Sequence, residues 1–385
     1  MSNGLSMTAT RPTLTRQKLQ ERCAVLHPRL TAAAREMVSR GAIGVAASVR
    51  VPGLAQPLVV VAGTADMAGT KPLCGDESFA IASQSKMFTA AAVLLLAREG
   101  VIRLSDPVTK YVGPVPAVDE DATIIQYLNH TSGIGNFIHA LTTLPWPWPR
   151  LSYEDILALA HVQGRRFRAG ARLDYNNTDV VVLARLCELV SGVPLPRFLA
   201  ERVFTPLQMN ETFVAAGVDG RRDHMAKGYY LPSQGYDGPP VDVTAMPDYS
   251  IAGAAGNIVS TLPDMMKWTD ALLSAGNATC LTLKDFVADV ADVGLGLPHW
   301  FFPRTYGRGV ERWCWAGRSF WGHRGSFFGY HSGTFVEPES GAAFSMFLTM
   351  CTRGGFMDFI NVQGHDYMAF MESCGHVAID AAELP

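Results

Sequence analysis

The stretch Ala82-Ser83-Gln84-Ser85-Lys86 lies where a short predicted strand gives way to a predicted helix whose next ten residues are almost wholly apolar. Three residues make nearly one helical turn, so Ser83 and Lys86 share a face and can reach each other. A lysine at the start of so apolar a helix is expensive to bury, and desolvation favours its neutral form, which can accept a serine proton. The pattern therefore predicts that Ser83 is a nucleophile and Lys86 its base.

The same stretch has a simpler interpretation, because a serine N-cap followed by a surface lysine is common in proteins without this chemistry. The apolar helix favours the catalytic interpretation. The helix N-terminus also leaves backbone N–H groups without intrahelical partners, and the Ser83 N–H is one that could hydrogen-bond a developing oxyanion.

Two polar segments further along the chain could complete such a site. Asp174-Tyr175-Asn176-Asn177 precedes a predicted helix, and His323-Arg324-Gly325-Ser326 precedes a predicted strand. Each has a structural alternative: Asn177 as a helix cap, Tyr175 as a residue at the rim of the core, and His323 as a hydrogen-bonded strand histidine. Because neighbours in a strand alternate faces, we expect Arg324 to point away from His323.

Taken in order, these segments resemble the Ser-x-x-Lys, Tyr-x-Asn and His-x-Gly motifs of the serine β-lactamase and penicillin-binding protein superfamily, specifically its class C β-lactamase, D-aminopeptidase and esterase branch. The resemblance extends over about residues 30–375. Four further segments resemble family motifs: residues 104–111, the His-Thr-Ser-Gly turn within 128–133, residues 204–209 with Gln208 in place of a glycine, and residues 255–261.

The resemblance implies an α/β (α+β) fold, in which a mixed, largely antiparallel sheet with flanking helices lies beside a mainly helical domain. We expect residues 1–28 to form an N-terminal extension and helix, residues 29–82 and 284–385 the sheet domain, and residues 83–283 the helical domain, with the active site between the two domains.

Local patterns predict the individual elements. Helices are predicted over residues 15–40 with a break at Pro28, and over 84–99, 153–162, 177–191, 195–203, 262–274 and about 358–374. Strands are predicted over residues 43–51, 58–63, 79–82, 328–336 and 342–349. Strands near both ends of the chain with helices between them predict one sheet built from both terminal regions.

The resemblance also implies roles for individual residues. The implied catalytic residues are Ser83, Lys86, Tyr175, Asn177 and His323. Ser83 would be the acylated nucleophile and Lys86 its proton-transfer partner. Tyr175 would be the second proton-transfer group, and Asn177 would hydrogen-bond Lys86 or the substrate. The N–H groups of Ser83 and Ser326 would form the oxyanion hole, and Gly325 would let the substrate lie along the strand edge. Whether Lys86 or Tyr175 is the base in each step stays open.

The third motif departs from the class C β-lactamases, which have Lys-Thr-Gly where this chain has His323-Arg324-Gly325. A mostly neutral imidazole attracts the carboxylate of a β-lactam less strongly than a lysine does. We therefore do not expect efficient penicillin hydrolysis. Trp146 and Trp148, in a Pro-Trp-Pro-Trp-Pro loop, are further candidates for substrate binding.

Composition excludes several other classes. The formal charge of -3 and the lack of a Lys/Arg-rich run do not favour nucleic-acid binding. Seven scattered cysteines without a C-x-x-C pair, and ten histidines without metal-ligand spacing, predict no disulfide pattern, no metal and no cofactor. The N-terminal residues lack the order of a signal peptide, and no apolar run is long enough to span a bilayer. We expect a soluble cytoplasmic protein with no membrane partner.

The sequence thus predicts a metal-independent serine hydrolase that acts through an acyl-enzyme on a small amide or ester: an amino-acid amide, a peptide or a carboxylic ester. The alternative is a transacylase that passes the acyl group to an amine or alcohol, as in a secondary-metabolite pathway. A true β-lactamase and a non-catalytic binder are less favoured. Nothing in the sequence indicates an oligomeric state.

Overall fold

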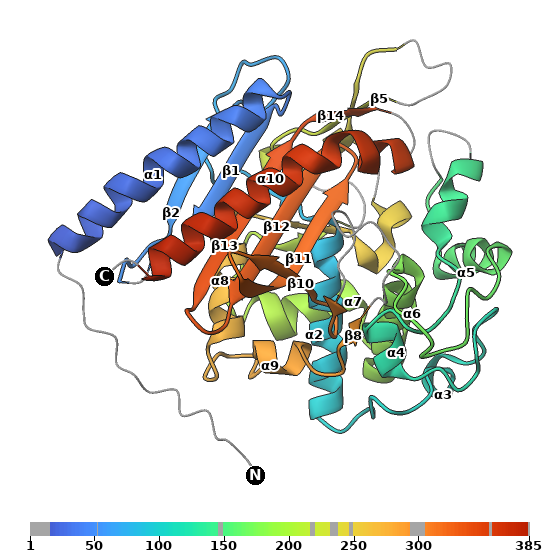
Figure 1. The fold of residues 1–385 in the computed structure, drawn as a ribbon. Coiled ribbons are helices and arrows are strands. Elements are labelled where there is room, and N and C mark those ends of the chain that lie inside the picture. The colour runs from blue at the N-terminus through green and yellow to red at the C-terminus, as the bar shows by residue number, and fades with distance from the viewer. Residues whose placement is uncertain are drawn as a thin grey trace.

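An eight-stranded sheet forms the centre of the fold in the computed structural model, which describes residues 16–51, 53–144, 149–215, 220–231, 238–245, 249–292, 305–353 and 356–383 (Figure 1). Its strand order is β2-β1-β13-β12-β11-β10-β9-β8, and all neighbours are antiparallel. The strands are β1 (Gly44–Val49), β2 (Leu58–Gly63), β8 (Ala291–Asp292), β9 (Thr305–Tyr306), β10 (Glu311–Trp315), β11 (Arg318–Phe327), β12 (Tyr330–Glu337) and β13 (Ala342–Thr349). The pairing of β1 with β13 confirms a sheet built from both terminal regions.

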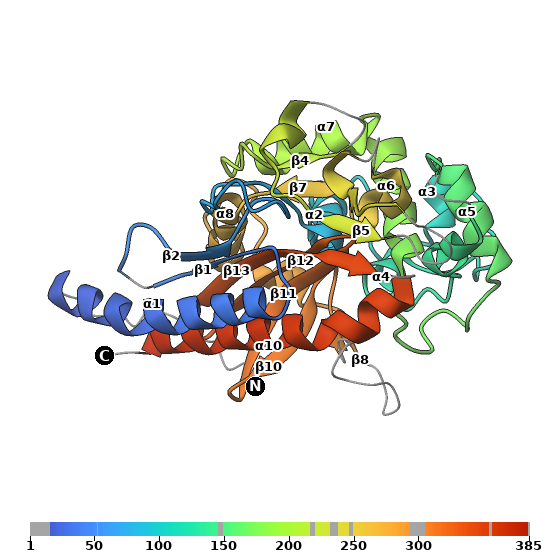
Figure 2. The same cartoon turned by 90° about the horizontal axis from the view of Figure 1, so that it is seen from above.

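Helices cover both faces of this sheet. The long helices α1 (Arg16–Ser39) and α10 (Phe356–Glu383) lie side by side over one face, as Figures 1 and 2 show. The other face is covered by α2 (Ser85–Arg98), α8 (Leu262–Leu273) and the remaining helical segments. Within the described residues, none of the helices has the combined length and apolar character needed to cross a bilayer.

The predicted break at Pro28 is wrong, because α1 runs through this residue without interruption. Leu26, Leu30 and Ala34 are fully buried at four-residue spacing on either side of Pro28, whose own ring is exposed. An interior proline removes one backbone hydrogen bond, but here the continuous apolar stripe packs against the sheet and α10 and keeps the helix intact.

Alternation along the strands divides the apolar residues between two cores. In β11, Phe320 belongs to the core beneath α1 and α10, whereas Trp321 and Phe327 belong to the core shared with α2 and α8. Since successive strand residues point to opposite faces, the even-numbered residues of β11 face α10 and the odd-numbered ones face the helical layer. This alternation places His323 on the helical side and Ser326 on the α10 side.

The helical layer begins and ends its main helices where the sequence predicts. A Ser152 capping box starts α5 (Tyr153–Val162), and the Asn176 side chain, which accepts a hydrogen bond from Thr178 N at 2.8 Å, starts α6 (Asn177–Ser191). Asn176 rather than Asn177 is therefore the cap, which leaves the Asn177 side chain available for other contacts.

The remaining elements are short. They are α3 (Thr109–Val112), α4 (Ile124–Leu128), α7 (Leu195–Leu199) with a π-helical continuation (Ala200–Phe204), α9 (Leu283–Phe286), and the 3₁₀ segments η1 (Ala82–Gln84), η2 (Phe137–Thr143), η4 (Gly220–His224), η5 (Val243–Ala245) and η6 (Ser250–Ala255). Two small sheets complete the fold: β3 (Phe79–Ala80), β7 (Ile258–Ser260) and β4 (Phe213–Val214) form one, and β14 (Cys351–Arg353), β5 (Tyr229–Leu231) and β6 (Val241–Asp242) form the other.

Candidate active site

Ser83 lies in η1, at the junction between β3 and α2. The preceding residue, Ala82, has φ of 50°, a left-handed conformation that costs a non-glycine residue about 1–3 kcal/mol. Ser85 holds this junction, because its Oγ donates to Ala82 O at 2.7 Å and accepts from Ile258 N at 3.1 Å. Ser85 is therefore committed to the backbone, whereas Ser83 is partly exposed at the bend.

Lys86 is 1% exposed, and its Nζ has three polar neighbours. Nζ lies 3.0 Å from Ser83 Oγ, 2.8 Å from Asn177 Oδ1 and 2.9 Å from Ala255 O. None of these partners is a carboxylate. Burial holds the pKa of Lys86 well below its ordinary value of 10.5, and the negative charge of Glu311 opposes this only in part.

Tyr175 and Asn177 reach the same point from the start of α6. Tyr175 shares a hydrogen bond with Ser83, and its ring centroid lies 4.8 Å from Lys86 Nζ. Burial raises the pKa of Tyr175 above its ordinary value, so its hydroxyl keeps its proton at neutral pH. The structure thus brings Ser83, Lys86, Tyr175 and Asn177 together from two separate stretches of sequence.

His323 lies inside β11, not before a strand as the sequence predicts. It is 1% exposed, and its Nδ1 is hydrogen-bonded to the Arg324 carbonyl, which can only accept. Nδ1 therefore carries the proton, and Nε2 is the acceptor for the Tyr306 hydroxyl at 2.8 Å. Burial, assisted by the Lys86 charge, holds the pKa of His323 well below 6.5 and keeps the ring neutral.

Arg324 points away from His323, as strand alternation predicts. Its guanidinium lies 4.9 Å from the ring centroid of Trp313, and its Nη1 lies 3.7 Å from Met368 Sδ of α10. Arg324 is therefore held on the α10 face of the sheet, where it does not replace the lysine of the β-lactamase motif.

Gly325 lies where β11 packs directly against η1. A Cβ built at this position would be 2.1 Å from Ile81 O and 2.6 Å from Ser332 Oγ, and that serine hydroxyl donates to Ile81 O at 2.8 Å. The missing side chain is thus needed for the close approach of β11 to the nucleophile segment. A contribution of Gly325 to substrate binding stays a prediction.

Ser326 directs its side chain to the α10 face, where Oγ lies 2.9 Å from His331 Nδ1. Its N–H points to the opposite strand edge from β12, because strand N–H groups alternate and the Arg324 N–H points toward β10. The packing at Gly325 brings this edge next to η1. This placement supports the predicted oxyanion role of the Ser83 and Ser326 N–H groups.

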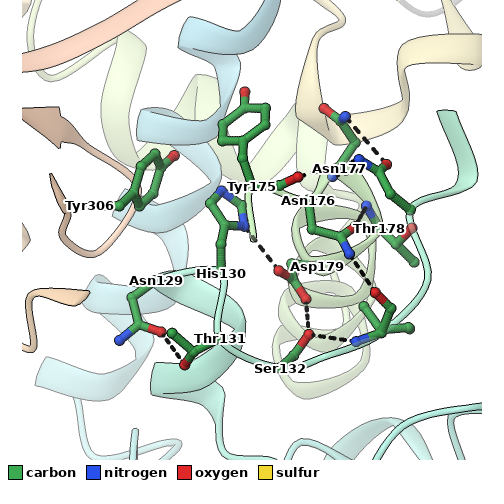
Figure 3. A network of polar contacts seen from close by, with 12 residues as sticks. Asn129, His130, Thr131, Ser132, Tyr175, Asn176, Asn177, Thr178, Asp179 and Tyr306 are labelled. Atoms are coloured by element: carbon green, nitrogen blue, oxygen red, sulfur yellow. Dashed lines mark hydrogen bonds and ion pairs between the residues drawn. The ribbon is translucent and has the colours of Figure 1, made fainter. Parts of the chain in front are cut away.

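A buried network behind Tyr175 was not predicted as part of the site (Figure 3). His130 Nδ1 lies 2.9 Å from Asp179 Oδ2, and Ser132 Oγ donates to Asp179 Oδ1. The His130 ring packs against Tyr175 and Tyr306, with centroid distances of 4.9 and 4.5 Å. The network fixes the imidazole against which both tyrosine rings pack, and the His-Thr-Ser-Gly turn is the sequence signal that could locate it.

Trp146 and Trp148 are outside the described residues. Among the residues that the structure does describe, the group whose ligand atoms could approach one metal ion is Cys74, Asp76 and Glu77. The Glu77 carboxylate already accepts hydrogen bonds from the N–H groups of Cys74 and Gly75, which explains its position as part of a turn.

Solved structures share this fold. A D-amino acid amidase from Ochrobactrum anthropi SV3, complexed with D-phenylalanine, superposes with a TM-score of 0.79 at 24% identity over 92% of this chain and 99% of that one. A D-stereospecific amidohydrolase from Streptomyces sp. superposes with a TM-score of 0.74 at 25% identity over 91% and 99% of the two chains.

Sequence relatives give the same family. Penicillin-binding protein 4 of Amycolatopsis lactamdurans is 29% identical over 73% of each chain. Matches to two penicillin-binding proteins of Bacillus subtilis are shorter, and this chain spans only 38% and 46% of their lengths. Residues 30–358 match the family described as Beta-lactamase. The chain, with its Ser83, Lys86 and Tyr175 cluster, therefore belongs to the beta-lactamase family.

Proposed function

We propose that the chain cleaves small amides or esters through an acyl-enzyme formed on Ser83. The observation that carries this proposal is the set of contacts around Lys86 Nζ. A neutral amine has two N–H donors and one lone pair. Asn177 Oδ1 and Ala255 O accept two N–H groups, and in the neutral amine the lone pair takes the place of the third N–H and faces Ser83 Oγ at 3.0 Å. Lys86 is thus arranged to take the proton as Ser83 attacks.

The residues of the candidate site can carry out the first half-reaction without a further group. Ser83 Oγ bonds to the substrate carbonyl carbon, its proton moves to Lys86 Nζ, and the N–H groups of Ser83 and Ser326 hydrogen-bond the oxyanion. Tyr175 donates its proton to the leaving amine or alcohol as the C–N or C–O bond breaks, and the proton on Lys86 restores the phenol. In the second half-reaction, the oxygen of a water molecule bonds to the acyl carbon and one water proton moves to Lys86 Nζ. The bond from the acyl carbon to Ser83 Oγ then breaks, Ser83 Oγ takes the proton from Lys86, and the carboxylic acid leaves.

The acyl group is proposed to be neutral or cationic near the scissile bond. His323 occupies the position of the β-lactamase lysine, is uncharged, and uses both ring nitrogens in hydrogen bonds. Amino-acid amides, short peptides and carboxylic esters fit this environment better than anionic β-lactams. The D-stereospecific amidohydrolase at 25% identity supports amide substrates.

Intact mass spectrometry tests the proposal directly. Wild-type protein and Ser83→Ala are exposed to a panel of activated esters, D-amino-acid amides and β-lactams, and the mass of the protein and the products are followed. We expect a transient acyl adduct on the wild type with esters or amides, and no adduct on the variant. The absence of any adduct and any turnover with wild-type protein would contradict the proposal.

Adding an amine to the same reactions separates hydrolysis from transfer. Hydrolysis predicts that the yield of acid from one ester donor is unchanged as the amine concentration rises. A growing amide product at the expense of acid would instead assign the chain to the transacylases. EDTA is expected to leave the rate unchanged.

A further inference from the structure

On the edge of β11 that carries the Ser326 N–H, the pairing with β10 stops before β11 itself ends. β10 pairs with β11 only over Arg318 to Gly322, with Glu311 opposite Gly322, whereas β11 continues to Phe327. The Arg324 N–H is the next edge donor after Gly322, and the Ser326 N–H follows it. In a longer β10, the residue two before Glu311 would accept from the Arg324 N–H.

The chain cannot supply that residue, because it turns away at Gly309. This glycine has φ of 80°, and its N–H donates to Leu128 O at 3.0 Å. An added Cβ would lie 2.5 Å from Ala90 Cβ of α2. The turn before β10 therefore packs onto the helix that carries Lys86 and does not follow β11.

Glu311 fills the gap with its side chain. The carboxylate is 1% exposed and accepts from Arg324 N at 2.8 Å and from Arg324 Nε at 3.3 Å. A buried carboxylate with a backbone N–H at this distance acts as one more strand residue would, because it satisfies the edge donor and holds it in the plane of the sheet.

We propose that Glu311 is a positioning residue of the oxyanion hole: its carboxylate occupies the Arg324 N–H, so that the Ser326 N–H is the first donor on this edge left for a substrate oxygen. The inference rests on the proposed acyl-enzyme function and adds a residue to it. Without the carboxylate, two adjacent edge donors compete for the substrate, and the end of β11 loses the contact that ties it to β10.

The charge of Glu311 supplies a second readout, which is separate from its hydrogen bond to the Arg324 N–H. Burial raises the pKa of Glu311, while its pairing with Arg324 lowers it. As an anion, Glu311 raises the pKa of Lys86 against the larger effect of burial. Removing the charge while keeping the hydrogen bond should therefore lower the pKa of Lys86 and move the acid limb of the acylation profile to lower pH.

Two conservative variants separate the effect of the length of the Glu311 side chain from the effect of its charge. Glu311→Asp keeps the charge but shortens the side chain, so the Arg324 N–H loses its acceptor. Glu311→Gln keeps the acceptor and removes the charge. Glu337→Asp is the matched control, because Glu337 is also 1% exposed in this sheet and accepts from Glu339 N at 2.9 Å and Ser340 N at 2.7 Å, at the hairpin between β12 and β13.

The acylation rate with an activated ester, read by intact mass across a pH series, gives the outcome. We expect the acylation rate of Glu311→Asp to fall roughly tenfold to a hundredfold, which is less than the effect of removing a whole oxyanion donor. The acid limb of its pH profile should stay where it is in wild type. Glu311→Gln should stay within about fivefold on the plateau with its acid limb at lower pH. Glu337→Asp should acylate like wild type even where its thermal unfolding midpoint falls.

Other outcomes overturn the inference. Wild-type rates and an unmoved limb in both Glu311 variants would show that the carboxylate positions nothing. Losses that follow the thermal unfolding midpoint equally in Glu311→Asp and Glu337→Asp would make Glu311 a structural residue only. A wild-type protein that is not acylated at all would instead overturn the proposed function, and the inference with it.

Discussion

The Tyr306 hydroxyl lies 2.8 Å from His323 Nε2, and this contact defines the chemical state of the third motif. With the Nδ1 proton directed to the Arg324 carbonyl, the ring can accept from Tyr306 only while it is neutral. His323, which the motif resemblance aligns with the lysine of class C β-lactamases, is therefore an uncharged imidazole with both nitrogens in hydrogen bonds.

Benzylpenicillin is accordingly expected to be a poor substrate and a slow acylating agent. His323→Lys should raise the rate of β-lactam acylation relative to that of a neutral ester, because the ammonium attracts the carboxylate and Tyr306 can accept from it. The ratio of the two acylation rates is the measurement. Faster turnover of penicillin than of simple esters by wild-type protein would contradict the assignment of His323.

Ser83 is expected to be the site of covalent labelling by a fluorophosphonate. Ser83→Ala should remove the label, whereas Ser85→Ala should keep it and lower stability by about 1–3 kcal/mol, because the Ile258 N–H loses its buried acceptor. Peptide mapping of the labelled protein locates the adduct. Labelling that persists in Ser83→Ala would place the nucleophile elsewhere.

Tyr175→Phe keeps the ring that contacts His130 and Lys86 and removes the hydroxyl that is hydrogen-bonded to Ser83. Loss of an acid–base group predicts a decrease in turnover of roughly a hundredfold or more. Steady-state kinetics with an amide, whose leaving group needs a proton, is the appropriate assay. A decrease under about threefold would leave Tyr175 with a packing role, since acid–base groups contribute far more than that.

Lys86 should make stability depend on pH in a defined direction. Its folded pKa is lowered, so between that value and the ordinary 10.5 the unfolded chain binds one more proton than the folded chain. The free energy of unfolding therefore rises with pH across this window, by up to about 1.4 kcal/mol per pH unit from this group, and the contribution is lost as pH falls to the folded pKa.

Lys86→Met has no titratable group at this position, so this contribution to the pH dependence of stability is absent. Urea denaturation of both proteins at a series of pH values should show that the stability of the variant relative to wild type decreases as pH rises through the window. A difference independent of pH would mean that Lys86 is charged in the folded protein. The variant should also lose acylation, as the base is gone.

Gly325→Ala should destabilise the protein by about 1–3 kcal/mol and reduce acylation by more than tenfold, because the new Cβ would force β11 away from Ile81 O. Gly276→Ala is the matched control, since a Cβ there meets nothing within 4 Å. Thermal unfolding and acylation rates of the two variants are compared. An unchanged Gly325→Ala would show that β11 and η1 are not in close contact.

The sequence predicts the parts of this molecule that depend on local interactions. The bounds of α5 and α6 agree with prediction because Ser152 and Asn176 cap their first turns. β11 was not predicted, because its glycines and charged residues do not form an apolar strand pattern, and its partners β10 and β12 supply the pairing instead. The sequence therefore predicts that the His323 motif precedes a strand, whereas the motif lies within β11.

The residues of the candidate site also differ in whether their contacts are local or are made between strands. Ser83 and Lys86 are one helical turn apart, so their contact could be predicted from spacing alone. Tyr306 and Glu311 could not, because they act through contacts made across strands: Tyr306 meets His323 and Glu311 meets Arg324 only once β9, β10 and β11 are assembled. No local pattern distinguishes these two residues from other polar strand residues.

The pairing of Gly44 with Thr349 has a consequence for the order of synthesis. During translation, β1, Ser83 and Lys86 are made well before β11, which carries Ser326, and β13, which pairs with β1. Contacts so distant along the chain form late and slowly. A nascent chain therefore carries Ser83 before it has the strand that would hold an oxyanion, and the proposed site is incomplete until β11 and β13 have been made.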